Sequence, residues 1–124
     1  MARDYSRTER VGDFLRAELA SLIQQEIRDP RVGMVSVTAV DVSRDLGHAK
    51  VFVTEVGKGS EEEMGGTLEA LNHAAGFLRS QLAGNSRMRT TPRLRFYYDS
   101  SVLRGSHLTE LIESVQPGDE GEQD

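Results

Sequence analysis

The first long pattern of apolar residues predicts a helix from about Ser6 to Arg28. Ser6 and Glu9 form a capping-box pattern at its beginning. Asp29-Pro30 ends it, because the residue before a proline is disfavoured in the α region. The apolar positions recur every three or four residues and so share one helical face: Val11, Phe14, Leu15, Leu19, Leu22, Ile23 and Ile27.

Two strands are predicted next, because β-branched and apolar residues alternate with polar ones. The first strand, over residues 34–43, is rich in valine, although its alternation is imperfect. A short turn over residues 43–47 connects it to the second strand, over residues 48–56, and predicts an antiparallel hairpin. The second strand has two faces, one with Ala49, Val51 and Val53 and the other with Lys50, Phe52, Thr54 and Val56.

A second helical pattern contains a glycine. A glycine inside a helix costs about 1 kcal/mol relative to alanine. Gly76 therefore indicates either a close backbone approach or a bend at Ala74-Ala75-Gly76, where two helical segments meet. A capping-box pattern over residues 60–63 predicts the helix start, and residues 83–85 its end. The apolar positions step through the glycine at helical spacing: Met64, Leu68, Leu71, Ala75, Leu78 and Leu82.

The last strand is predicted over residues 93–98, and a short helix around residues 106–115 follows it. The chain is thus expected to form one α+β domain over residues 1–116, with helices on one face of a three-stranded sheet. Residues 117–124 are acidic and glycine-rich, and we expect a disordered tail there. The last strand has two faces, one with Leu94, Phe96 and Tyr98 and the other with Arg93, Arg95 and Tyr97.

Composition argues against several classes of protein. The 124 residues include no cysteine, which excludes disulfides and cysteine-ligated metals and favours a reducing cytoplasm. No apolar run approaches the roughly 20 residues of a membrane span, and the first residues lack the apolar region of a secretory signal. We therefore expect a cytoplasmic protein without a membrane partner.

Motifs for catalysis are missing as well. His48, His73 and His107 do not have the spacing of metal ligands, and no serine lies in a nucleophile-elbow motif. The sequence contains no Walker A motif, and the glycines at 57 and 59 do not complete a dinucleotide-binding loop. We expect no enzyme activity, no cofactor, no metal and no small-molecule substrate.

The basic residues are unevenly distributed. The net charge is −5, but acids at residues 61–63 and in the last nine residues account for more than this deficit. From Arg79 to Arg95 the chain carries five arginines and no acid. Arg93, Arg95 and Tyr97 share a strand face, which suits phosphate contact and base stacking. Alternatively, these arginines pair with acids elsewhere, such as residues 61–63, and Tyr97 is a half-buried strand residue.

The chain resembles the ribosome-binding factor A family over roughly residues 5 to 115. Its most specific parts are Ser6–Val11, Glu26–Arg31, Leu71–Arg79 and Arg93–Ser101. It implies a type II K-homology-like fold with the order αββααβ. In that family an Ala-x-Gly kink, here Ala74-Ala75-Gly76, replaces the G-x-x-G loop of ordinary K-homology domains.

The resemblance also implies a function. Members of this family are non-catalytic factors that bind the free 30S small ribosomal subunit late in assembly. They support maturation of the 5′ end of 16S rRNA, and they are associated with growth in the cold. We expect the same partners here, the 30S subunit and its 16S rRNA, and a monomeric protein.

The residues expected to contact RNA are basic, and their role would be to neutralise phosphates without reading sequence. Ala74 and Gly76 are expected to shape the kink. Two alternatives remain open: a general single-stranded RNA-binding module of the K-homology type, and a domain that docks on a ribosomal protein or an assembly GTPase. The expected RNA-contacting residues are Arg7, Arg10, Arg31, Lys50, Arg79, Arg87, Arg89, Arg93 and Arg95.

Overall fold

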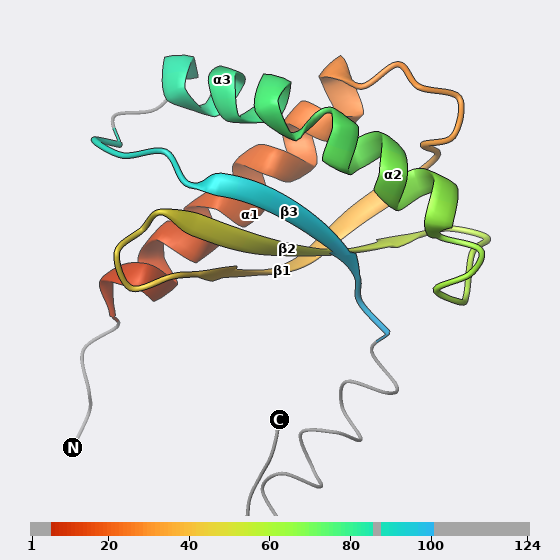
Figure 1. Cartoon of the computed structure of the whole chain (residues 1–124), viewed down its shortest axis with the longest axis horizontal. Coiled ribbons are helices and arrows are strands. Elements are labelled where there is room, and N and C mark those ends of the chain that lie inside the picture. Colours follow the sequence, from red (N-terminus) through yellow and green to blue (C-terminus); the bar gives the residue numbers. More distant parts are fainter. Residues whose placement is uncertain (1–5, 86–87, 101–124) are drawn as a thin grey trace, which may run out of the picture.

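Three helices cover one face of a three-stranded sheet (Figure 1). The computed structural model describes residues 6–85 and 88–100, so the predicted helix over residues 106–115 and the tail over residues 117–124 lie outside the described residues. The element order confirms the expected αββααβ: α1 (Arg7–Glu26), β1 (Val35–Val42), β2 (His48–Glu55), α2 (Gly65–His73), α3 (Ala75–Asn85) and β3 (Arg93–Tyr98).

The sheet has the strand order β1-β2-β3. β1 and β2 form the predicted antiparallel hairpin, whereas β3 pairs with β2 in parallel after α2 and α3 have crossed the sheet. The register shifts between Val37, which pairs with Val53, and Ala39, which pairs with Phe52. This bulge at Thr38 explains the imperfect alternation of the first strand, because the valines on both sides of the bulge pack against the core.

The core lies between the sheet and the helices. Leu15, Leu19, Leu22 and Ile23 of α1 are buried in it, as predicted. Phe14, which was expected on the same apolar face, instead keeps 39% of its surface exposed, because it lies at the margin of that face. The buried apolar residues of the remaining chain are Val37, Ala49, Val51, Val53, Met64, Ala70, Leu71, Leu78, Leu82, Leu94 and Phe96.

Gly12 allows α1 to approach the sheet closely. The residue is buried, and a Cβ atom at this position would lie 2.8 Å from the carbonyl oxygen of Val40. That separation is shorter than ordinary contact with a carbon atom, so a larger residue would push α1 away from β1. The helical pattern did not reveal this contact, because glycine is not counted among the apolar positions.

The two predicted helix starts have different outcomes. At α1 the capping box is present: the Glu9 amide donates to Ser6 Oγ at 3.2 Å, and the Ser6 amide donates to Glu9 Oε1 at 3.0 Å. Ser60 Oγ likewise accepts a hydrogen bond from the Glu63 amide at 3.1 Å, but α2 begins only at Gly65. The expected start was wrong because the Gly65 amide bonds to the carbonyl of Glu62, three residues back, which interrupts the helical ladder.

The kink lies where the sequence predicted it. α2 ends at His73, and the amide of Ala74 donates to the carbonyl groups of both Ala70 and Leu71 before α3 begins at Ala75. Gly76 belongs to α3, and apart from its chain neighbours and the nearby backbone of its own helix no described atom lies within 4 Å of the position that a Cβ atom would occupy. The break therefore occurs at Ala74, and no close approach within the described chain requires a glycine at position 76.

Candidate nucleic-acid interface

The face of the sheet opposite the helices carries aligned basic and aromatic side chains. We call it the open sheet face and define it by His48, Lys50 and Phe52 of β2 and Arg93, Arg95 and Tyr97 of β3. Because β2 and β3 are parallel and adjacent strands lie about 4.8 Å apart, side chains in register are neighbours. The register pairs His48 with Arg93, Lys50 with Arg95 and Phe52 with Tyr97.

The cations of the open sheet face are available to a ligand. Lys50, Arg93 and Arg95 are all exposed. Within residues 6–85 and 88–100, no carboxylate oxygen lies within 4.0 Å of their charged nitrogens. Asp41 is the register partner of Lys50 on β1, and it forms no ion pair with Lys50 in this part of the chain. The alternative that Arg93 and Arg95 pair with described acids is therefore wrong.

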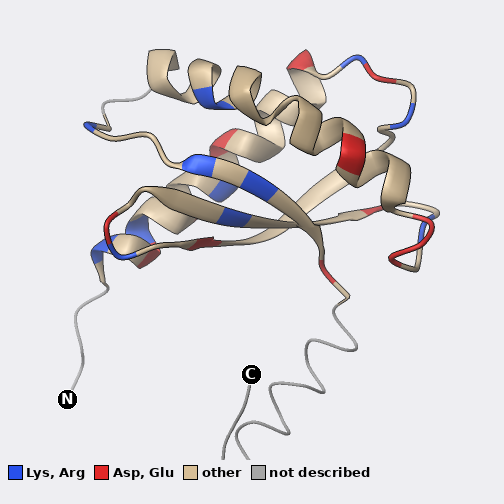
Figure 2. Cartoon of the chain, viewed as in Figure 1, with Lys and Arg blue, Asp and Glu red and all other residues tan. Residues whose placement is uncertain are grey.

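A second basic group lies at the beginning of α1. Arg7 and Arg89 line one small hollow of about 110 Å³ together with Leu46 of the β1–β2 turn. Arg10 lines a neighbouring apolar hollow of about 340 Å³ with Phe14. The amide of Arg93 donates to the carbonyl of Gly47 in the same turn, so the two basic groups lie at one end of the molecule. Figure 2 shows basic positions on β2, on β3 and at the beginning of α1.

The other expected RNA-contacting residues are placed differently. Arg79 Nε donates to the carbonyl of Thr91 at 2.9 Å and so holds the segment before β3 against α3. Arg31 lies in the α1–β1 loop, where it forms ion pairs with Asp29 at 2.8 Å and Glu69 at 3.2 Å. Arg87 lies outside the described residues. The structure thus brings together Arg7, Arg10, Lys50, Arg89, Arg93 and Arg95, and it separates Arg31 from them.

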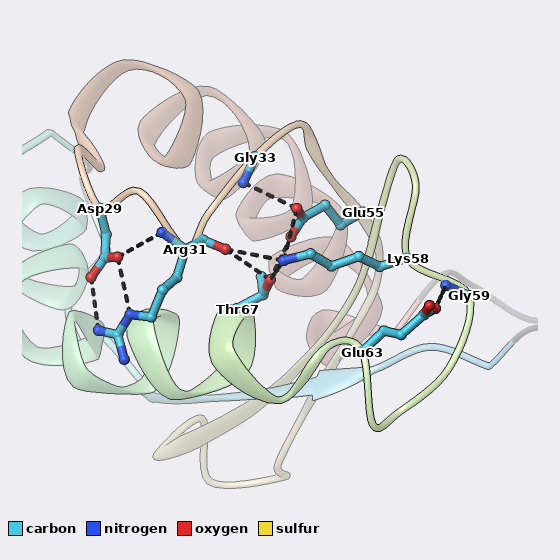
Figure 3. A network of polar contacts seen from close by, with 8 residues as sticks. All are labelled: Asp29, Arg31, Gly33, Glu55, Lys58, Gly59, Glu63 and Thr67. Atoms are coloured by element: carbon cyan, nitrogen blue, oxygen red, sulfur yellow. Dashed lines mark hydrogen bonds and ion pairs between the residues drawn. The ribbon is translucent and has the colours of Figure 1, made fainter.

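Around Arg31 a polar network connects the α1–β1 loop to β2 and α2 (Figure 3). Glu55 is buried, with 8% of its surface exposed, and its carboxylate accepts hydrogen bonds from the Thr67 hydroxyl and the Gly33 amide. Lys58 Nζ lies 3.1 Å from Glu55 Oε2 and donates to the carbonyl of Arg31 at 3.2 Å. The alternating pattern of β2 places Glu55 on the buried face with Ala49, Val51 and Val53. A carboxylate at a buried strand position is the sequence feature from which this network could have been predicted.

We expect Asp29→Asn to lower the melting temperature near neutral pH and to have a much smaller effect at pH 2. The Arg31 side chain, which hydrogen-bonds to the carboxyl group, lowers the pKa of Asp29 from 3.8 to about 2. A lowered folded-state pKa adds stability that is present above pH 3.8 and is lost as pH falls through about 2. Thermal unfolding of both proteins between pH 7 and pH 2 tests this, and a difference that persists undiminished at pH 2 would contradict it.

The described residues offer neither a membrane span nor a metal site. None of the helices within residues 6–85 and 88–100 has the length and hydrophobicity that crossing a bilayer requires. The same part of the chain contains no group of three or more histidine or acidic side chains positioned to hold a metal ion.

Comparison with known proteins agrees with this fold. A protein from Pseudomonas syringae pv. syringae named ribosome-binding factor A is 59% identical over 113 residues, covering 91% of this chain and 82% of the relative. The crystal structure of ribosome-binding factor A from Thermus thermophilus is 35% identical, with a TM-score of 0.64, and the match covers 76% of this chain and 97% of that one.

A second structural match concerns a complex. A homology model of Thermus thermophilus ribosome-binding factor A, fitted into a cryo-EM map of its complex with 30S, is 34% identical with a TM-score of 0.60. It covers 72% of this chain and 92% of that one. The family model described as ribosome-binding factor A matches residues 7–112. With the fold, the kink and these matches in agreement, the chain belongs to the ribosome-binding factor A family.

Proposed function

We propose that this chain is a non-catalytic assembly factor that binds the free 30S ribosomal subunit late in its maturation. The observation that carries the proposal is the group of exposed cations on the open sheet face, which have no carboxylate partner among the described residues. The Thermus thermophilus relative in the 30S complex supports the choice of partner. A factor that acts on this subunit works in the cytoplasm.

The chemistry of this surface suits contact with RNA phosphates. Each phosphate that a lysine or arginine neutralises releases condensed counterions, so affinity depends steeply on salt. Such contacts position the protein without reading the RNA sequence. A factor that binds one conformation of the maturing RNA better than the others shifts the population towards it. By this route the factor would support maturation of the 5′ end of 16S rRNA and growth in the cold.

We expect Arg93→Ala/Arg95→Ala to weaken binding to immature 30S subunits about tenfold, with a shallower salt dependence. Each lost phosphate contact should reduce the slope of log K against log salt by about 0.7 to 0.9. The measurement is co-sedimentation with immature and mature subunits over a salt series. The matched control is Arg16→Ala/Arg28→Ala, which removes the same charge at exposed positions outside both basic groups.

Two outcomes would contradict the proposal. Binding that ignores both salt and the Arg93/Arg95 variant would favour the alternative of docking on a ribosomal protein or an assembly GTPase. Failure of the unchanged protein to bind either form of the subunit would exclude the proposed partner. Cleavage of precursor rRNA by the purified protein alone would exclude a non-catalytic role.

A further inference from the structure

We propose that the acidic segment over residues 117–124 binds the cations of the open sheet face and competes there with RNA. This segment lies outside the described residues. It contains no base, and its acids are Asp119, Glu120, Glu122 and Asp124. The contact would be regulatory, because RNA could use these cations only while the segment is displaced. This consequence rests on the proposed function, whereas the contact itself can be tested without RNA.

The described chain ends beside the open sheet face. Asp99 follows β3, and its amide donates to the carbonyl of Val53 at 2.8 Å. Its carboxylate accepts a hydrogen bond from the hydroxyl of Thr38 at the β1 bulge. Alternation along β3 places Asp99 on the same face as Arg95. The chain therefore leaves the described residues at the end of the open sheet face that is remote from Arg93.

The connection to the acidic segment is long enough to return to the cations. It consists of the sixteen residues 101–116, which would span about 24 Å as a helix and up to about 55 Å when extended. Arg95 and Arg93 precede Asp99 by about 13 and 20 Å along the strand. Either conformation of the connection therefore allows the contact, and such a tether gives an effective concentration in the millimolar range.

The spacing of the acids matches the spacing of the arginines. Glu120, Glu122 and Asp124 lie two positions apart, so in an extended conformation their side chains would share one side at intervals of about 6.7 Å. Arg93 and Arg95 have the same interval on β3, at about 6.7 Å. Two neighbouring acids of the segment could therefore face both arginines at once.

The other charges of the face select the position of the segment. Asp41 is the register partner of Lys50 on β1, and Asp99 lies at the end of the face remote from the arginines. Either acid would repel a carboxylate above it. Near the beginning of β3, in contrast, a carboxylate would meet exposed arginines that have no acidic partner among the described residues. We therefore place the segment above Arg93 and Arg95, beside Lys50.

Competition of this kind has a defined effect on affinity. A ligand whose site is free for only a fraction of the time binds more weakly by that fraction. If the segment occupies the arginines about two thirds of the time, every RNA that uses them binds about threefold more weakly. Salt screens ion pairs at a surface, so the contact should be strong at about 50 mM salt and fade towards about 500 mM.

The first test observes the contact in the full chain without RNA. Two-dimensional amide NMR spectra of the unchanged protein and of Glu120→Gln/Glu122→Gln are compared at about 50 and 500 mM salt. We expect the amide signals of Lys50, Arg93 and Arg95 to differ between the two proteins at low salt and to coincide at high salt. Signals that are the same at low salt would overturn the inference.

The second test measures binding of the same proteins to a fluorescently labelled RNA hairpin at about 50 mM salt, where phosphate contacts are strong. Glu120→Gln/Glu122→Gln should bind the hairpin about threefold more tightly than the unchanged protein. The matched control is Glu61→Gln/Glu62→Gln, which makes the same chemical change at exposed positions between β2 and α2. Its affinity should stay within about 1.5-fold, because charges remote from the bound RNA are screened.

A third comparison locates the contact. In the Arg93→Ala/Arg95→Ala background, neutralising the acidic segment should no longer change hairpin affinity. A gain that persists there would mean that the segment binds elsewhere, and an equal gain in the matched control would mean that net charge alone is responsible. Either result overturns the inference, as does the absence of any gain. Thermal unfolding verifies that each variant is folded.

These outcomes are separate from those of the proposed function. A hairpin that binds no form of the protein would contradict the RNA contact of the proposed function, and the NMR comparison would still decide whether the segment binds the open sheet face. Co-sedimentation with 30S subunits tests the partner independently. A protein that binds subunits but shows no NMR difference loses only the regulatory contact.

Discussion

Lys58→Met is expected to lower the free energy of unfolding by about 2–3 kcal/mol. The substitution leaves the buried carboxylate of Glu55 without its cation, which lies 3.1 Å away in the network of Figure 3. Breaking a buried ion pair from one side costs about 3–5 kcal/mol. We expect a smaller loss here, because the Lys58 side chain keeps 29% of its surface exposed and the Thr67 hydroxyl and Gly33 amide still donate to the carboxylate.

Urea denaturation at pH 7 measures the loss. Lys50→Met is the matched control: Lys50 is exposed, has no ion pair in the described part of the chain, and should change stability by less than about 0.5 kcal/mol. Adding Glu55→Gln to Lys58→Met should restore most of the loss, since a neutral amide needs no counter-charge. If Lys58→Met is as stable as the unchanged protein, Lys58 does not balance a buried charge.

Gly12→Ala is expected to destabilise the fold by about 2 kcal/mol, although alanine is the better helix former by about 1 kcal/mol. The added Cβ atom would lie 2.8 Å from the Val40 carbonyl oxygen, which belongs to the β1 backbone and cannot rotate away. α1 and β1 must therefore separate, and overpacking of this kind costs about 1–3 kcal/mol or occasionally more. The same urea experiment measures the effect.

Gly76→Ala is the control for Gly12→Ala. It makes the same chemical change in a helix, but outside the nearby backbone of that helix no described atom lies within 4 Å of the new methyl group. We expect unchanged stability or a gain of up to about 1 kcal/mol. If Gly12→Ala also stabilises the protein, the close approach of α1 to β1 is not as tight as the structure indicates.

Most of the architecture could be predicted from the sequence, because each element has its own period and its own end signals. The capping box at Ser6 and the kink at Ala74 depend on neighbouring residues, and both were located correctly. The bulge at Thr38 and the approach at Gly12 depend on how one element meets another. Contacts between elements that are distant in the chain leave no signal in the local sequence pattern, so both features became visible only in the structure.

In the candidate site, too, some features follow from the local sequence pattern and others only from the tertiary structure. Alternation in the last strand was sufficient to place Arg93, Arg95 and Tyr97 on one face, and the register then brought Lys50 and Phe52 beside them. The sequence could not show that Arg31 pairs with Glu69, which is distant in the chain and belongs to another element. Which cations stay without an acidic partner is a tertiary property, so the sequence alone could not distinguish Arg31 from Arg93 and Arg95 in this respect.

The parallel pairing of β3 with β2 has a consequence for the order of folding. The hairpin of β1 and β2 closes a short loop, whereas β3 can join only after α2 and α3 have been made, and distant contacts close later than local ones. During synthesis the chain emerges from its N-terminus, so the strand that carries Arg93, Arg95 and Tyr97 docks last. A nascent chain therefore lacks the complete cationic face of the sheet until β3 has paired with β2.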